Sequence, residues 1–519
     1  MTENSSDIIA GLMEDAETAL AAGQIAKALT LYQGILANDP DHVLALRQAG
    51  AIMIHQNNAA AALSFFERAA RRDPADPDLY HGLATALRLQ GQTDQAMLAL
   101  QGALRLDPSH PPALFDLGVL KRLKGDYGTA ERLLHAAASG TGQFEAIFQR
   151  AIALFRQDRL PEAERWFHWA GLINPSDPRP FINVAVIYRT WGHFDSAIKW
   201  LEKAIALDPE SVEAHWNLAN VRLVRGDLPQ GFQLYEWRFR RPGQSGPNTS
   251  LPRWAGESLS GKTLILMAEQ GIGDVIHFAR FAKQLAARGA RVVIQCHPGL
   301  EELLATVPGV SATVALGSPL PVADFSLPIM SLPLILGTTL ETIPGEVPYL
   351  SVTPATRVGL PPSPGLKVGL VWRGNPRHEN DRFRSIPLAV LEPILRVPGV
   401  TFYSLQVEQE LPEIRALPTG VTVHELGPLV AGFSSTAAVV KALDLVITVD
   451  TAMAHLSGAL GQKTWVMLGR GNDWRWLHLR SDSPWYPTVR LFRQGPPRDW
   501  GPVVKPIAHE LQKLASSGP

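Results

Sequence analysis

A glycine-rich turn near the middle of the chain carries the first side chain that could do chemistry. The turn reads EQGIGD, from Glu269 to Asp274, and follows a short run typical of a buried strand. Gly271 and Gly273 allow close approach of the backbone to a ligand, and Asp274 stands where a helix would begin. Aspartate at such a place also caps helices, so the turn by itself allows either role. A dinucleotide-binding fingerprint fits poorly, because Ile276 occupies the position of its third glycine.

Two further turns carry groups suited to phosphate. The first contains VWRGNP and DRFRSIP, where the guanidinium groups of Arg373, Arg382 and Arg384 can bind phosphate through paired donors. The competing interpretation of that stretch is a solvated loop. The second contains Asp450, Thr451 and His455, at a strand end that opens a helix. Free backbone N–H groups and the helix dipole favour an anion there, and His455 falls one turn further on the same face. A lone histidine is more often structural, but its company here favours ligand binding.

The composition limits the other classes of function. The 519 residues are enough for two to four domains, and 48 basic against 49 acidic residues leave a formal net charge of −1. No phosphate-neutralising surface for nucleic acid follows from that balance. The single cysteine, Cys296, excludes an intrachain disulfide. The start of the chain lacks the pattern of a signal peptide and no apolar run is long enough for a membrane span, so we expect a cytoplasmic protein.

No metal or other cofactor is expected. No Asp-x-Asp pair occurs after residue 242, and the 15 histidines show no ligand spacing. Arginines and helix N-termini would then have to hold a diphosphate, so we predict a metal-independent site.

The first half of the chain repeats with a period of about 34 residues, and three series of positions share that period. Small residues that let paired helices approach lie at Ala28, Ala62, Ala96, Ala130, Ala163, Ala197 and Gly231. Turns between paired helices lie at Gly23, Asn57, Gly91, Gly125, Arg159, Gly192 and Gly226. Units end at Pro40, Pro74, Pro108, Gly142, Pro175 and Pro209. Such units bury their apolar faces only by stacking, which predicts a helical solenoid of about seven repeats.

A stacked array of this kind exposes a concave groove, into which the sixth position of each repeat should point. Those positions are Gln48, Gly82, Asp116, Gln149, Asn183 and Asn217. Four of them are amides, which can donate to and accept from an extended peptide backbone. The alternative is that they are ordinary solvated helix positions.

From Lys262 onward, strands and helices alternate, which predicts parallel sheets covered by helices. The expected strands are Thr263–Ala268, Arg291–Gln295, Lys367–Trp372, Val400–Leu405, Val421–His424, Leu445–Val449 and Thr464–Leu468. The expected helices are Asp274–Arg288, Leu300–Thr306, Leu388–Arg396, Ser434–Leu443 and Ala452–Leu460. A proline-rich stretch separates two doubly wound lobes, so a ligand crevice is expected between them, at the carboxyl ends of the strands.

The repeats resemble tetratricopeptide repeats (TPR), and the whole chain resembles bacterial TPR glycosyltransferases whose catalytic half is similar to lipopolysaccharide heptosyltransferases. The stretches that carry this resemblance are EQGIGDVIHFARF, VWRGNP, DRFRSIP, SLQ, VDTAMAHLSGALG, DWRW and SPWYP. The nuclear and cytosolic O-GlcNAc transferases share only the plan. One departure from the family pattern is Ala452, which replaces a glycine, and the usual donor-contacting lysine has no evident match.

The resemblance implies an all-α TPR solenoid followed by an α/β fold of the glycosyltransferase-B (GT-B) type, with two Rossmann-like lobes. We expect the solenoid over residues 1–240, a linker over 241–261 and an acceptor-side lobe over 262–351. A hinge over 352–366 and a donor-side lobe over 367–519 complete the division.

The resemblance also implies an inverting enzyme that moves a sugar from a nucleotide sugar to Ser or Thr of a protein held by the repeats. Asp274 would be the catalytic base. The expected donor-binding residues are Gly271, Gly273, Arg373, Asn375, Arg384, Ser385, Gln406, Asp450, Thr451 and His455. Some members modify flagellin with nonulosonic acids, which makes flagellin a candidate acceptor. Two alternatives stay open: a heptosyltransferase-like enzyme acting on glycan or lipid, and a non-catalytic scaffold.

Overall fold

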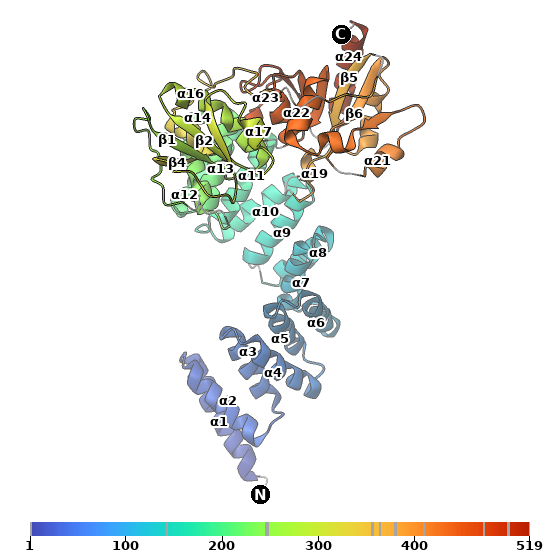
Figure 1. The fold of residues 1–519 in the computed structure, drawn as a ribbon. Helices are drawn as coiled ribbons and strands as arrows, with labels where there is room; N and C mark the ends of the chain where they lie inside the picture. Colours follow the sequence, from blue (N-terminus) through green and yellow to red (C-terminus); the bar gives the residue numbers. More distant parts are fainter. Residues whose placement is uncertain are drawn as a thin grey trace. The chain divides into compact units, whose positions relative to one another are not determined.

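The first part of the chain is entirely helical in the computed structural model (Figure 1). The structure describes residues 3–141, 144–243, 246, 249–353, 358–362, 365–377, 381–407, 410–470, 473–495 and 499–517. The helices of the array are α1 (Glu3–Ala21), α2 (Ile25–Asn38), α3 (Val43–His55), α4 (Ala59–Arg72), α5 (Pro77–Leu89), α6 (Thr93–Leu106), α7 (Pro111–Leu123), α8 (Tyr127–Thr141), α9 (Phe144–Arg156), α10 (Leu160–Ile173), α11 (Arg179–Trp191), α12 (Phe194–Leu207), α13 (Val212–Arg225) and α14 (Leu228–Tyr235).

The repeat spacing explains why these helices pair. The repeat alanines have no exposed surface: Ala28, Ala62, Ala96, Ala130, Ala163 and Ala197. Gly231 takes the alanine position in the last unit, where an added Cβ would lie 2.6 Å from Leu223 Cδ2. Close approach of the paired helices therefore requires a small side chain at each of these positions.

Each turn inside the repeats contains a residue with left-handed backbone, and this residue is the predicted turn position in every repeat except one. Asn57 has φ 58° and Gly226 has φ 97°. In the fifth repeat the left-handed residue is Asp158, at φ 64°, and not the predicted Arg159. That repeat is one residue shorter than its neighbours, and aspartate tolerates the left-handed conformation better than arginine does. The predicted terminator Gly142 lies outside the described residues.

The second half contains two sheets, and every pairing within the named strands is parallel (Figure 1). The first sheet has the order β3-β2-β1-β4, and the second has the order β10-β9-β8-β5-β6-β7. The strands are β1 (Thr263–Met267), β2 (Arg291–Cys296), β3 (Val310–Ala315), β4 (Phe325–Pro328), β5 (Leu366–Val371), β6 (Val400–Ser404), β7 (Val423–Glu425), β8 (Leu445–Val449), β9 (Thr464–Leu468) and β10 (Val489–Arg493). A TPR solenoid followed by two parallel α/β sheets confirms the predicted fold class and is consistent with GT-B.

Helices and single turns connect the strands. They are α15 (Ile272–Phe278), α16 (Ala282–Ala287), α17 (Glu301–Leu304), α18 (Leu332–Ile335), α19 (Asp381–Arg384), α20 (Glu392–Leu395), α21 (Pro412–Arg415), α22 (Phe433–Lys441), α23 (Ala452–Ala459) and α24 (Gly501–Ser516). Short 3₁₀ segments are η1 (Glu236–Arg240), η2 (Ala279–Phe281), η3 (Ile329–Ser331), η4 (Leu388–Leu391), η5 (Gly427–Val430) and η6 (Trp474–Trp476). None of the described helices is long and apolar enough to cross a membrane.

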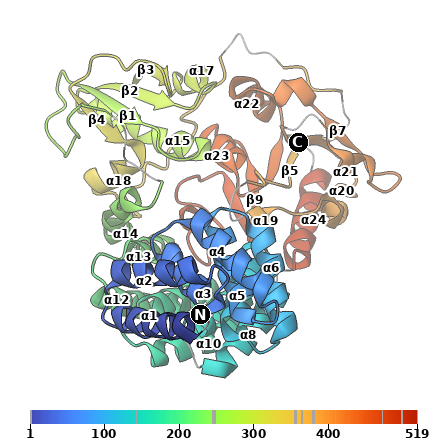
Figure 2. The same ribbon diagram turned by 90° about the horizontal axis from the view of Figure 1, so that it is seen from below.

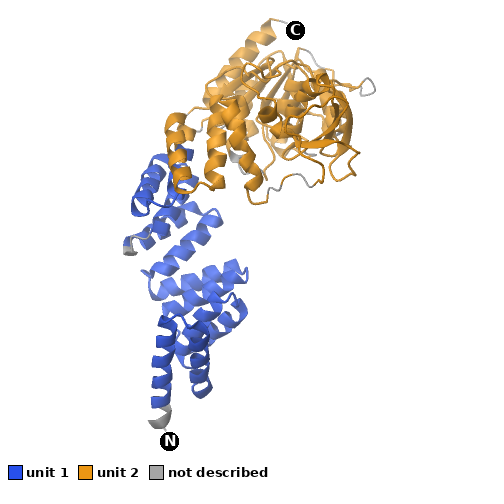
Figure 3. Cartoon of the chain, turned by 90° about the vertical axis from the view of Figure 1, so that its left-hand side faces the viewer, with its two compact units in different colours: residues 1–187 blue, residues 188–519 orange. Residues whose placement is uncertain are grey.

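The chain divides into two compact units, residues 1–187 and residues 188–519 (Figure 3). The helices α12, α13 and α14 continue the repeat pattern but lie wholly in the second unit. Leu223, Phe232 and Tyr235 of these helices belong to the same hydrophobic core as Leu264 of β1 and Phe278 of α15. The last repeats therefore share a core with the sheets.

Some predicted boundaries are shifted. The helix expected over Asp274–Arg288 begins at Ile272 and is interrupted by η2. The strands β3, β4 and β10 were not predicted. Parts of the expected linker and hinge, residues 244, 245, 247, 248, 354–357, 363 and 364, lie outside the described residues.

Candidate functional site

The turn after β1 places Asp274 in the first turn of α15. Its Oδ2 accepts a hydrogen bond from the Gly271 N–H at 2.8 Å, so one oxygen satisfies a free backbone donor of the helix end. Its Oδ1 lies 2.6 Å from Nη2 of Arg475, which is 201 residues away in the chain. The capping role and the functional role are therefore compatible, because each uses a different oxygen.

Glu269, in the same turn, has a structural task. Its two oxygens accept from Arg238 at 2.6 and 3.0 Å, and Oε1 also accepts from the Met330 N–H. Arg238 is 1% exposed and also bonds Glu236 and Ser331. This buried network ties η1, at the end of the repeats, to the first sheet.

The turn after β8 places Asp450 and Thr451 at the start of α23. Thr451 is the N-cap, and its Oγ1 accepts from the Met453 N–H at 3.3 Å. Asp450 Oδ1 accepts from the Trp476 indole N–H at 2.8 Å. Burial and the nearby Asp473 raise the pKa of Asp450 to about 6, because both disfavour its charged form. This helix start therefore places a buried carboxyl with a raised pKa beside the backbone N–H groups of the first helical turn.

His455 lies on the same helix but is buried. It is 7% exposed, its ring stacks on Trp476 at 5.4 Å, and its Nδ1 lies 3.1 Å from the Tyr486 hydroxyl oxygen. Burial, together with the charge of Arg475, lowers the pKa of His455 to about 3. The structure thus places a neutral imidazole behind the Asp450 turn.

The two turns meet directly, and Figure 2 shows α15 and α23 side by side. A Cβ added at Gly273 would lie 2.9 Å from His455 Cδ2 and 3.4 Å from the Ala452 Cα. The glycine at 273 is therefore needed for the approach of the two helices. Asp274 and the Asp450 turn come from different sheets, and this contact brings them to one place.

The arginine loop, residues 371–376 and 381–387, contacts the Asp450 turn through Arg384. Arg384 Nη1 donates to the Asp450 carbonyl oxygen at 2.9 Å. Ser385 Oγ donates to Asp381 Oδ1 and accepts from the Gly374 N–H, each at 2.9 Å, which fixes the loop.

Other residues expected to bind the donor have partners within the protein. Arg373 pairs with Glu413 at 3.2 Å, and Asn375 Oδ1 accepts from the Arg377 N–H. Gln406 Oε1 accepts from the backbone N–H groups of Trp372 and Arg373, which holds the start of the loop. The side chain of Arg382 lies outside the described residues.

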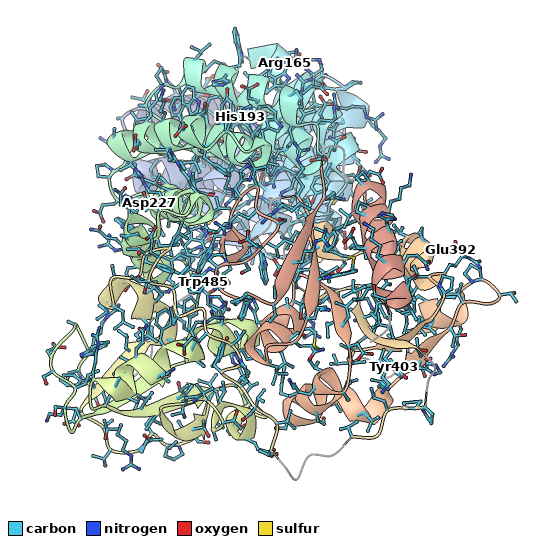
Figure 4. The ribbon with its side chains drawn as sticks, turned by 90° about the horizontal axis from the view of Figure 1, so that it is seen from above. Arg165, His193, Asp227, Glu392, Tyr403 and Trp485 are labelled. Carbon is cyan, nitrogen blue, oxygen red and sulfur yellow. The ribbon has the colours of Figure 1, made fainter. Side chains whose placement is uncertain are left out.

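The segment SPWYP, residues 483–487, contacts both α15 and α23. The Tyr486 hydroxyl lies 2.9 Å from His277 Nδ1, in addition to its contact with His455. Arg280, 3% exposed, donates to the Trp485 carbonyl oxygen and to the Tyr349 hydroxyl. Figure 4 labels Trp485 in this region. These buried contacts connect α15 to α23 and to the segment that follows β4.

Sequence reasoning missed Arg475. The DWRW stretch contributes only to the family resemblance, yet its arginine, 4% exposed, contacts the candidate base. No local pattern signals this contact, although an arginine beside two aromatic residues and an aspartate is an unusual set for a surface loop.

The residues expected to line the groove bond mostly within their own helices. Asn183 Nδ2 donates to the Arg179 carbonyl oxygen and Asn217 Nδ2 to that of Glu213, both at 2.9 Å. Gln149 donates to Glu145, and Asp116 pairs with His81 of the preceding repeat at 2.9 Å. Gln48 is half-buried on α3. The amide oxygens of Asn183 and Asn217 are not used in these bonds.

Comparisons with known proteins support the repeats. The tetratricopeptide repeat family matches residues 19–87, 53–117 and 148–169, and the TPR repeat family matches residues 185–223. Protein FlbA of Caulobacter vibrioides is 26% identical over 532 residues, covering 95% of this chain and 83% of that protein.

Solved TPR structures are similar to part of the chain. One is YrrB, described as a TPR protein with an unusual peptide-binding site, at 21% identity and a TM-score of 0.33, covering 35% of this chain and 95% of that chain. Another is a TPR protein from Parabacteroides merdae, at 18% identity and a TM-score of 0.37, covering 47% of this chain and 95% of that chain. The chain therefore contains tetratricopeptide repeats over the matched residues, and it is similar to Protein FlbA over nearly its full length.

Proposed function

We propose that this chain is an inverting, metal-independent glycosyltransferase that moves a sugar from a nucleotide sugar to a Ser or Thr hydroxyl of a protein. The observation that carries the proposal is the meeting of the two turns. Gly273, next to Asp274 in the turn after β1, packs against Ala452 and His455, directly after the Asp450–Thr451 turn. Arg384 donates to the Asp450 carbonyl oxygen. A carboxylate base and an anion-suited helix start are the two parts that such a transfer needs.

In the proposed reaction, the acceptor oxygen forms a bond to the anomeric carbon as the bond from that carbon to the donor phosphate oxygen breaks. Asp274 takes the hydroxyl proton, and the nucleotide leaves with its phosphates near Thr451 and Arg384. A carboxylate is too weak to deprotonate a hydroxyl beforehand, so proton transfer accompanies bond formation and contributes about 10²–10⁴-fold. Burial raises the pKa of Asp274, which makes it a stronger base than an exposed aspartate.

The repeats would supply the protein acceptor. TPR arrays expose extended surfaces that bind proteins, and the amide oxygens of Asn183 and Asn217 are available to a peptide N–H. Flagellin is the first acceptor to test, on the basis of the family resemblance.

The test is intact-mass spectrometry of the abundant exported proteins, flagellin first, from cells that carry the wild-type chain or Asp274→Ala. We expect sugar-sized mass increments to disappear in the variant. The matched control is Asp324→Asn, which directly precedes β4 and whose carboxylate bonds Lys262 and the Thr263 N–H at the amino end of β1. Near-normal modification by Asp274→Ala would show that Asp274 is not the base.

A second experiment tests whether the acceptor is a protein. Because the core of α12–α14 is shared with the sheets, the informative truncation removes residues 1–187 and leaves the second compact unit. We expect modification of the acceptor to be lost. Unchanged activity would favour a glycan or lipid acceptor, for which the repeats are unnecessary.

A further inference from the structure

Arg475 is a buried cation held between two carboxylates. It is 4% exposed, its Nη2 donates to Asp274 Oδ1 at 2.6 Å and its Nη1 to Asp473 Oδ1 at 2.8 Å. Its guanidinium also lies over the Trp474 ring at 4.4 Å. Such a group cannot change its partners without desolvated charges being left behind.

The two ion pairs of Arg475 differ in what they connect. Asp473 is two residues away and caps η6, because its Oδ1 accepts from the Arg475 N–H. Asp274 belongs to the turn after β1, in the other sheet. The pair with Asp274 is thus the one that crosses between the lobes of the second unit, and it uses the carboxylate oxygen that the helix cap leaves free.

We propose that Arg475 is a positioning residue for Asp274: it reaches across from the second sheet, fixes the direction of the carboxylate and keeps it charged while the two lobes are in contact. This inference rests on the proposed role of Asp274 as the base. On this proposal, Asp274 can act as the base only while α15 contacts the DWRW segment, residues 473–476.

Several other groups near Asp274 also affect its pKa. Asp473 acts on it from the DWRW segment, His297 from the end of β2, the Gly271 N–H from its own turn and Tyr235 from α14. Burial is the largest influence and raises the pKa of Asp274, and Asp473 adds to that effect. Arg475 is the largest influence in the opposite direction. Removal of the Arg475 charge should therefore raise the pKa of Asp274 further.

The backbone beyond Arg475 supports a fixed position. Leu477 is 3% exposed and has φ 52° and ψ −171°, a conformation that residues other than glycine rarely adopt. Arg493 Nε and Nη2 donate to the carbonyl oxygens of Arg480 and Trp476. Strain of this kind persists only where surrounding contacts determine it, so the segment is held in one conformation.

The test is an infrared titration of the full chain, which distinguishes a protonated carboxyl from a carboxylate and needs no substrate. The signal of Asp274 is isolated as the difference between spectra with and without Asp274→Asn, in the wild-type, Arg475→Met and Arg475→Lys backgrounds. We expect the midpoint of Asp274 to move upward by about 1–3 pH units in Arg475→Met. Arg475→Lys, which keeps the charge without the fork of donors, should give a smaller upward movement.

The matched control is Arg384→Met, which removes a cation from the same place but one that bonds the Asp450 turn. It should leave the Asp274 midpoint unchanged. An unchanged midpoint in Arg475→Lys and Arg475→Met, or an equal movement in Arg384→Met, would overturn the proposal. Retained modification by Asp274→Ala in cells would instead refute the base assignment, so the two failures are distinguishable.

Discussion

The shared core of the last repeats and the sheets gives a quantitative prediction for Phe232→Ala. Phe232, on α14, is 1% exposed, and its ring meets Trp474 edge-to-face at 5.3 Å. Truncation of a buried phenylalanine to alanine costs about 3–5 kcal/mol, which includes the cavity that remains. That is a large fraction of the about 5–15 kcal/mol that stabilises a typical domain.

The expected consequence is faster hydrogen exchange in the sheets, measured by mass spectrometry on the full chain. Since about 1.4 kcal/mol is a factor of ten, amides of β1 that exchange by unfolding of the second unit should do so about 10²- to 4 × 10³-fold faster. The control is Phe66→Ala, 3% exposed in the first unit, which should accelerate exchange in α3–α5 and leave β1 protected. If Phe232→Ala accelerates exchange only in the repeat helices, the shared core is not one cooperative unit and the reasoning fails.

Three other substitutions test separate features. Asp450→Asn should become more stable relative to wild type as pH rises from about 4 to about 6, because the pKa of Asp450 is raised and its ionisation costs the wild type stability in that window. The measurement is the free energy of unfolding in urea. A difference between the two proteins that stays constant from pH 4 to pH 7 would contradict the prediction. Leu479→Gly should increase the free energy of unfolding by up to about 1 kcal/mol and so raise the thermal midpoint, because Leu479 is 83% exposed and has φ 54°. A lowered midpoint would show that no backbone strain is relieved. Gly469→Ala should weaken binding across a panel of nucleoside diphosphates in calorimetry, because its Cβ would overlap the Phe383 carbonyl oxygen and displace the arginine loop. The control is Gly495→Ala, which should bind as wild type because nothing lies within 4 Å of an added Cβ there. Equal binding by both variants would contradict this prediction.

The site itself was only partly predictable. Asp274, Asp450 and Thr451 follow strand ends, as their sequence pattern predicted, and the carboxyl ends of parallel strands are where ligands bind in such folds. Their roles stay predictions. Arg373, Asn375 and Gln406 were expected to bind the donor with them, yet the structure shows Arg373 paired with Glu413 of α21, and Asn375 and Gln406 accepting from backbone N–H groups of the loop. The direction in which a side chain points depends on its tertiary contacts, which local sequence does not specify.

The unpredicted strands have a common cause. β3, β4 and β10 are all at the edges of their sheets. An edge strand is covered on fewer sides, so it needs no continuous apolar run: β3 is mostly half-exposed, and β4 has only four residues and ends in Pro328. Central strands such as β8 and β9 are fully buried, and their apolar runs predicted their bounds correctly.

Residue spacing was enough to predict the repeats and the alternation of strands and helices, because these depend on contacts within about 34 residues, where helix pairing and strand burial are local. Tertiary packing was needed to show that the compact second unit begins at Tyr188 and includes the last repeats. It also brought Arg475 to Asp274 across 201 residues. A period reports which residues pack against their neighbours in the chain, whereas a shared core and a buried ion pair depend on which distant surfaces are complementary, and no spacing encodes that.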